Sequence, residues 1–231
     1  AYISVVEALK HSSFACNSDL EIMWMDSELL NDANVAEELK EADGIIVPGG
    51  FGDRGIEGMI SAIQYARENN IPYLGLCLGM QLTIVEFARH VLGYHDANSS
   101  EFNPSSVHQV IHIMPDQDGV TDLGGTLRLG AYPCVLKESS KSYALYGQKE
   151  ITERHRHRYE VNNDYREALV AGGMDLVGQS PDGHIVEMIE IPEHPWFVGT
   201  QAHPEFKSRP NKPHPLFKGF VTAALEHQEK K

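Results

Sequence analysis

The chain has 231 residues, of which 42% are hydrophobic and 23% are charged, as is typical of a globular protein. Its formal net charge of −14 argues against partners that are themselves anionic, such as nucleic acid or a membrane surface. Three widely spaced cysteines predict neither a disulfide framework nor a zinc knuckle. With no signal-peptide pattern and no apolar run of ~20 residues, we expect a cytoplasmic protein.

Helical and strand patterns alternate in the first part of the chain, which predicts parallel strands. The segment 44–47 is an apolar run that ends at Pro48-Gly49-Gly50, as a buried strand would. A helical stripe from Ile56 to Ile63 follows it. The other predicted elements here are helices over 2–11, 35–40 and 78–91 and strands over 21–25 and 72–76.

The second part of the chain is rich in short strand patterns, with Pro181-Asp182-Gly183 as a hairpin turn and a last helix over 216–227. The predicted strands are 107–113, 127–136, 151–161, 176–179, 184–191 and 196–202. The predicted class is therefore α/β, a doubly wound mixed sheet with helices on both faces and an added antiparallel portion. We expect one domain over residues 1–231. Because such domains usually start with a strand, we also expect that an N-terminal strand is missing.

Gly75-Leu76-Cys77-Leu78-Gly79 has the G-x-nucleophile-x-G form of a nucleophile elbow, a sharp turn from strand to helix. The glycines permit the strained backbone and close packing of such a turn. The following helix N-terminus stabilises a thiolate and offers N–H groups to an oxyanion. A free cysteine is more often a buried structural residue, but this setting favours Cys77 as a nucleophile.

His203-Pro204-Glu205 follows the strand predicted over 196–202. Proline forces His203 into an extended conformation, in which Glu205 points to the same side and can reach the imidazole. A carboxylate on one ring nitrogen leaves the other free to take a thiol proton. A loop histidine beside a solvated glutamate is the alternative, but the presence of Cys77 upstream favours a Cys-His-Glu triad.

The glycine-rich segment 48–52 follows a predicted strand, so its N–H groups can approach a substrate oxygen. It is the second candidate for an oxyanion site, and an ordinary turn is the alternative.

With these three features in place, the chain resembles the class I (triad) glutamine amidotransferases, and among them the glutaminase domains of bacterial-type CTP synthases. The elbow and His-Pro-Glu are typical of the whole family, whereas the run Arg-His-Arg-His-Arg-Tyr-Glu over 154–160 separates this group from the others. The resemblance extends over essentially the whole chain. The segments that carry it are 48–55, 75–81, 99–102, 153–160, 201–206 and 208–217.

The resemblance implies a role for several residues in holding glutamine. It implies that Gly50 and the Leu78 amide line the carbonyl site, with Gln81 close by. It also implies that Glu101 holds the α-amino group, while Arg158 and the Tyr159 backbone hold the α-carboxylate. Gly52 belongs to a lid loop, Gly52-Asp53-Arg54-Gly55, that the resemblance links to GTP activation and to the ammonia route.

Alternation along 154–159 places the three arginines on one face of a strand and His155, His157 and Tyr159 on the other. A basic strand edge in solvent is the alternative for one or two of the arginines, and a nucleic-acid patch is disfavoured by the net charge. His108 and His112 are spaced as on a metal-binding helix, but their segment reads as a strand, so we expect no metal.

The expected reaction is the hydrolysis of glutamine to glutamate and ammonia through a Cys77 thioester. By resemblance the ammonia goes to a CTP synthase amidoligase domain, and we expect no cofactor in this domain. The complete enzyme is expected to use ATP and Mg²⁺, to respond to GTP as an allosteric activator and to form a homotetramer. The alternatives are another amidotransferase of the family, such as that of GMP synthesis, a free γ-glutamyl hydrolase, or a glutamine-sensing module without turnover.

Overall fold

The computed structural model describes residues 2–114 and 127–231, and within them two sheets form the centre of the fold. The larger sheet has seven strands in the order β1-β2-β10-β9-β8-β5-β6, and the smaller has three in the order β3-β4-β7. β1, β2 and β10 are parallel, and the later strands of the large sheet are antiparallel. The strands are β1 (Ile45–Val47), β2 (Tyr73–Leu76), β3 (Asn98–Ser99), β4 (Gln109–Ile113), β5 (Arg128–Leu136), β6 (Glu150–His157), β7 (Tyr159–Val161), β8 (Asp175–Gln179), β9 (Val186–Glu190) and β10 (Phe197–Thr200).

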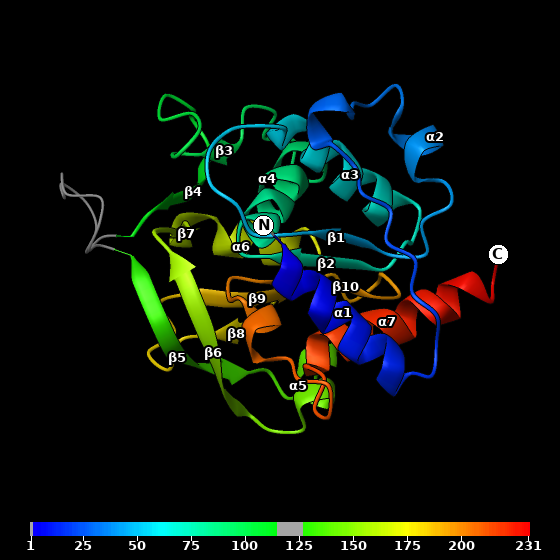
Figure 1. Ribbon diagram of the computed structural model, residues 1–231. Coiled ribbons are helices and arrows are strands. Elements are labelled where there is room, and N and C mark those ends of the chain that lie inside the picture. Colours follow the sequence, from blue (N-terminus) through cyan, green and yellow to red (C-terminus); the bar gives the residue numbers. More distant parts are fainter. Residues whose placement is uncertain (1, 115–126) are drawn as a thin grey trace.

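Helices cover both faces of the large sheet, and β5 and β6 run steeply across the direction of β1 and β2 (Figure 1). The α-helices are α1 (Ile3–Ala15), α2 (Val35–Leu39), α3 (Ile56–Glu68), α4 (Leu78–His90), α5 (Lys141–Tyr146), α6 (Arg166–Ala171) and α7 (Pro215–Gln228). The predicted doubly wound mixed sheet with an antiparallel portion is confirmed.

Two hydrophobic cores lie on the two faces of the sheet, because successive strand residues point to opposite sides. On β2, Tyr73 contributes to the core beneath α3 and α4, whereas Leu74 and Leu76 contribute to the core beneath α1 and α7. All three side chains are fully buried, so both faces of β2 are covered by the cores. Burial on both faces is what the unbroken apolar run of this strand predicts.

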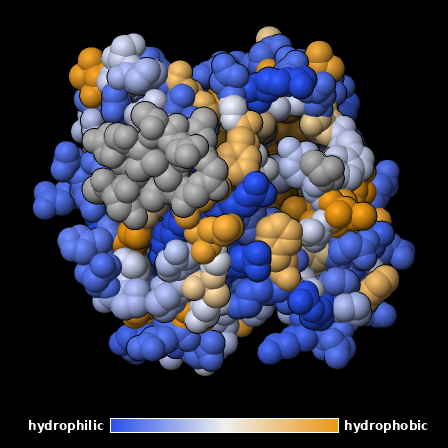
Figure 2. Space-filling model, turned by 60° about the vertical axis from the view of Figure 1, so that its left-hand side comes forward, coloured by the Kyte–Doolittle hydropathy of each residue, from blue (hydrophilic) through white to orange (hydrophobic). Residues whose placement is uncertain are grey.

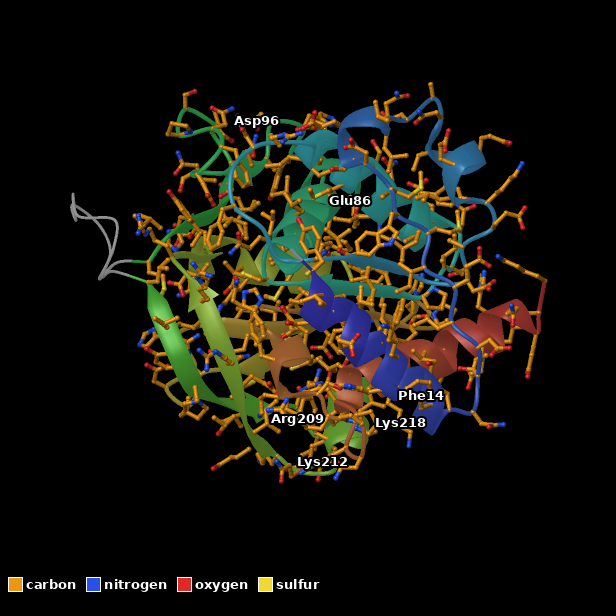
Figure 3. All side chains as sticks on the ribbon, in the orientation of Figure 1. Phe14, Glu86, Asp96, Arg209, Lys212 and Lys218 are labelled. Carbon is orange, nitrogen blue, oxygen red and sulfur yellow. The ribbon has the colours of Figure 1, made fainter. Side chains whose placement is uncertain are left out.

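The side of the large sheet that holds α3 and α4 also contains a buried charge. Glu86 of α4 is fully buried, and Arg67 of α3 reaches it with Nη2 at 2.7 Å from Oε1. Figure 3 shows Glu86 among the helices, in contrast to Lys212 and Lys218 near the opposite end of the molecule. The guanidinium compensates the buried carboxylate and so ties the two helices together.

Glycines let α4 approach the sheet. A methyl group on Gly79, in the first turn of α4, would lie 2.1 Å from the carbonyl oxygen of Val47 on β1. The hydroxyl of Tyr73 donates to the Gly79 carbonyl at 3.1 Å, which closes the contact from β2. The N-terminus of α4 therefore rests directly on two parallel strands.

The strand predicted over residues 21–25 is wrong, because residues 17–26 have no strand structure. Met23 and Trp24 are exposed there, 46% and 66% respectively, so the apolar residues of this segment do not belong to a strand of the core. The strand predicted over 151–161 is interrupted at Arg158, so β6 belongs to the large sheet and β7 to the small one. Most other predicted elements differ only at their ends, since helix and strand ends are weakly specified.

The surface seen in Figure 2 is mostly hydrophilic, with apolar residues interspersed near its centre. No helix within residues 2–114 or 127–231 is both long enough and apolar enough to cross a membrane.

Substitution of Gly79 by alanine should destabilise the protein by about 3 kcal/mol, because the added methyl group overlaps a backbone carbonyl that cannot move aside cheaply. Chemical unfolding would measure the loss. Gly93→Ala is the control, since nothing lies within 4 Å of the added methyl group and only its φ of +76° opposes the change, at about 1 kcal/mol. Equal losses in the two variants would contradict this account of the α4 contact.

Candidate active site

Cys77 lies at the turn between β2 and α4 with φ 51° and ψ −100°, a strained conformation for a residue that is not glycine. The side chain is buried, 4% exposed. Its N–H donates to the carbonyl of Thr200 on β10 at 2.8 Å, which holds the turn against the neighbouring strand. This is the geometry that the glycine-flanked cysteine predicts for a nucleophile elbow.

The elbow places Cys77 at the positive end of α4. Leu78 is the first residue of that helix, so its N–H is among those that helix hydrogen bonds do not use. Gly50 lies opposite, because a methyl group there would be 3.3 Å from Leu78 Cδ2. The structure therefore brings together the two residues expected to form the oxyanion site.

His203 and Glu205 are in contact, with Nδ1 2.8 Å from Oε1. The local structure differs from the extended segment predicted, since residues Pro204–Lys207 form a 3-10 helix. His203 itself is not helical, with φ −113° and ψ 72°, as expected before proline. The His203 N–H donates to the Arg154 carbonyl at 2.7 Å, which fixes the segment to β6.

The imidazole of His203 and the Cys77 side chain both face Gly49. A methyl group on Gly49 would lie 2.7 Å from His203 Cε1 and 3.4 Å from Cys77 Cβ. Burial alone would lower the pKa of His203, but the Cys77 sulfur and the Glu205 carboxylate outweigh it and raise this pKa to about 10. The protonated form of the His203 imidazole is therefore favoured near neutral pH.

A cavity of ≈ 350 Å³ opens beside the elbow. It is lined by the residues expected to hold glutamine except Gly52, and by four others that sequence reasoning did not assign to the site. The lining residues are Gly50, Phe51, Cys77, Leu78, Gln81, Glu101, Leu127, Arg156, His157, Arg158 and Tyr159.

Opposite charges stand in the cavity wall at Glu101 and Arg158. Burial raises the pKa of Glu101, whereas a hydrogen bond from the Gly52 N–H and the charge of Arg158 oppose that rise. The Gly52 N–H thus contacts Glu101, although Gly52 does not line the cavity itself. An anion and a cation held apart in one pocket suit a zwitterionic amino acid.

Gln201 is a residue of the site that the sequence did not reveal. Its Nε2 donates to Cys77 Sγ at 3.5 Å, and its Oε1 accepts from Gln81 Nε2 at 3.1 Å. Gln81 also donates to the Tyr159 carbonyl at 3.0 Å. The one feature of the sequence that indicates a site role for Gln201 is its position two residues before His203.

The alternation predicted over 154–159 is present as far as His157, since His155 and His157 are buried while Arg154 and Arg156 are exposed. It does not continue to Tyr159, because the strand is interrupted at Arg158. Arg156 places its guanidinium 5.5 Å from the centre of the Phe51 ring, which directly precedes the predicted lid loop. Arg54 of that loop pairs with Glu28 on the surface.

Comparison with known proteins agrees with this geometry. The family model described as Glutamine amidotransferase class-I matches residues 1–223. Curated CTP synthases of Clostridium beijerinckii and Staphylococcus saprophyticus are 57% and 58% identical over all 231 residues. The chain spans 43% of the length of each of these relatives.

The fold is similar to a solved structure of the Trypanosoma brucei CTPS glutaminase domain, which contains bound acivicin. The TM-score is 0.91 at 40% identity, and the match covers 97% of this chain and 88% of the other. The chain therefore belongs to the class I glutamine amidotransferase family, among the glutaminase domains of CTP synthases.

Proposed function

We propose that the chain hydrolyses L-glutamine to glutamate and ammonia, with Cys77 as nucleophile, His203 as base and Glu205 as the group that orients the base. The observation that carries the proposal is the strained Cys77 elbow facing an imidazole whose other nitrogen is 2.8 Å from a carboxylate. A cysteine activated by an oriented histidine is the arrangement that amide-cleaving thiol enzymes need.

Glutamine binds with its zwitterionic end between Glu101 and Arg158, and the Tyr159 N–H adds a donor to the carboxylate. The side chain then extends past Gln81 toward Cys77. This orientation is supported by the position of these residues around one cavity. The lid residue Gly52 closes over the substrate from the side of Glu101, to which its N–H is bonded.

The Cys77 thiolate attacks the carboxamide carbon, and the carbonyl oxygen becomes an oxyanion against the Gly50 and Leu78 amides. The His203 imidazolium gives its proton to the leaving nitrogen, so the C–N bond breaks and ammonia departs. Cys77 is left as a γ-glutamyl thioester. Water then loses a proton to His203 and attacks the thioester, which releases glutamate and restores the thiolate.

The ammonia serves, in this proposal, a synthase domain that converts UTP to CTP in a longer protein. The identity with complete CTP synthases and the 43% coverage support this assignment. ATP and Mg²⁺ would be bound outside residues 1–231, with GTP as the activator and a homotetramer as the assembly. Nucleic acid and membrane are not partners in this scheme, and the protein works in the cytoplasm.

Cys77→Ala should abolish ammonia release while glutamine affinity stays within about threefold, because binding rests on the charged groups of the cavity and not on the sulfur. Ammonia production and calorimetric titration with glutamine would measure the two quantities. A covalent adduct of 6-diazo-5-oxo-norleucine at Cys77 in the unmodified protein is expected as well. Turnover by Cys77→Ala, or reversible glutamine binding with no adduct, would contradict the enzymatic assignment.

Glu205→Gln should shift the pH dependence of Cys77 alkylation by iodoacetamide to higher pH. The carboxylate raises the His203 pKa, so its loss lowers that pKa and favours the neutral thiol–imidazole pair over the thiolate–imidazolium pair. The rate at pH 7 should fall by about tenfold or more. An unchanged pH profile, read by mass spectrometry of the Cys77 peptide, would remove Glu205 from its assigned role.

The role in CTP synthesis has a test of its own. A CTP synthase whose native glutaminase domain is replaced by this chain should form CTP from glutamine. Cys77→Ala in the chimera should abolish this glutamine-dependent synthesis, while ammonia-dependent synthesis persists. Glutaminase activity without any glutamine-dependent CTP would refute the assignment to CTP synthesis and leave the glutaminase assignment standing.

A further inference from the structure

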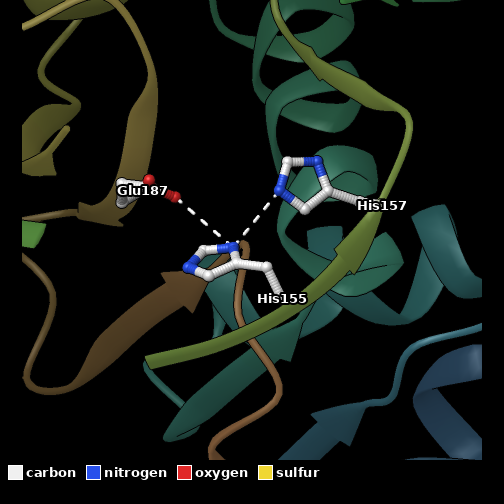
Figure 4. A group of neighbouring side chains, drawn as sticks. All are labelled: His155, His157 and Glu187. Carbon is white, nitrogen blue, oxygen red and sulfur yellow. Dashed lines mark hydrogen bonds and ion pairs between the residues drawn. The ribbon is translucent and has the colours of Figure 1, made fainter. Parts of the chain in front are cut away.

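Four polar side chains form a buried cluster beside the cavity, and the reaction proposed above uses none of them. They are Arg128 of β5, His155 and His157 of β6, and Glu187 of β9, each at most 8% exposed. Arg128 Nη2 lies 2.6 Å from Glu187 Oε1, and its Nη1 is 3.4 Å from a ring nitrogen of each histidine. Figure 4 shows the two imidazoles on one strand and Glu187 on another, with their side chains close together.

The histidines and Glu187 offer ligand atoms within 4.8 Å of one another, as a metal site would. Arg128 already places a positive charge among these atoms, and a divalent ion would have to displace it. The guanidinium is therefore the cation that balances Glu187.

His157 is held in one neutral tautomer. Its Nδ1 is 3.0 Å from the Tyr159 carbonyl oxygen, which can only accept, so Nδ1 carries the proton. Its Nε2 lies 3.2 Å from His155 Nδ1 and 3.4 Å from Arg128 Nη1. The guanidinium can only donate, so Nε2 carries the lone pair. Burial and then the charge of Arg128 lower the pKa of His157 to about 3, which excludes the doubly protonated ring near neutral pH.

The hydrogen bond from His157 Nδ1 holds the backbone at Tyr159, a residue that lines the substrate cavity. Met114 N–H donates to the Arg158 carbonyl and Asn162 N–H to the Val110 carbonyl, so β7 pairs with β4 through alternate residues. By that alternation the N–H and C=O of Tyr159 both point away from β4. The C=O is held by His157 and by Gln81 Nε2, each at 3.0 Å, and the N–H beside it is directed to the same side.

We propose that His157, kept in a single tautomer by Arg128, is a positioning residue that aims the Tyr159 N–H at the carboxylate of glutamine. This inference rests on the proposed glutaminase function and deepens it. The Arg128–Glu187 pair thereby influences substrate affinity without contact with the substrate. The nucleophile lies further along these contacts, beyond Gln81 and Gln201, so the thiol should keep most of its reactivity when His157 is changed.

The test compares two labels of Cys77 in the purified protein: 6-diazo-5-oxo-norleucine, which carries an amino-acid end, and iodoacetamide, which does not. His157→Phe should raise the half-saturating concentration of the first by about tenfold, equivalent to about 1.4 kcal/mol. The iodoacetamide rate at Cys77 should stay within about twofold. No rise, or an equal loss with both labels, would overturn the proposal.

Two further variants separate positioning from packing. The amide nitrogen of His157→Asn falls near the position of Nδ1 and should restore most of the affinity, whereas His157→Gln places its amide near Nε2 and should not. This comparison decides the question even if His157→Phe does not fold, and equal affinities would refute the proposal. Absence of any adduct in the unmodified protein would overturn the glutaminase assignment, and this inference with it.

His194→Phe is the matched control. His194 is also a buried histidine with a ring nitrogen 3.1 Å from a backbone carbonyl, that of Ala66, but it lies away from the cavity. Its loss should lower stability as much as His157→Phe does, without changing the affinity for the label. A comparable loss of affinity in His194→Phe would show that destabilisation alone explains the effect.

Discussion

The active-site geometry depends on the close contact between the first turn of α4 and the parallel strands beneath it. Gly79 can approach the Val47 carbonyl only because it has no side chain. The Tyr73 hydroxyl donates a hydrogen bond to the Gly79 carbonyl and so holds the same turn against β2. With the helix this close, the chain has no room for a gradual turn, so Cys77 takes a strained conformation with positive φ. That strain directs the sulfur out of the turn, where Gln201 and His203 can reach it.

Strand order brings the distant parts of the site together. β2 and β10 are parallel neighbours, so their carboxyl ends lie at one edge, where Cys77 follows the first strand and Gln201 to His203 follow the second. β6 reaches the same edge from the antiparallel portion and supplies the Arg154 carbonyl that fixes His203. The added antiparallel strands therefore complete the site of a parallel fold.

Local patterns in the sequence predicted the parts of the site that depend on residues close together in the chain. The elbow at Cys77 followed from its glycines, and the Glu205–His203 contact followed from their spacing, although a 3-10 helix and not an extended segment produces it. Gln201 could not be assigned, because its role comes from a contact with Gln81, far away in the sequence. The strand expected over 21–25 failed because apolar composition alone cannot show whether a neighbouring strand is present to pair with it.

Three histidines near the cavity, of which His155 and His157 are buried and His203 is partly buried, show how neighbours give one residue type opposite roles. The pKa of His203 is raised to about 10 by a sulfur and a carboxylate that overcome burial. For His155 and His157, burial and the guanidinium of Arg128 act in the same direction, and their pKa values fall to about 2 and about 3. A proton entering the site therefore goes to His203, and the other two rings stay fixed as hydrogen-bonding groups of defined direction. His203 can therefore gain and lose a proton during turnover while His155 and His157 keep one charge state, and this division of roles requires both environments.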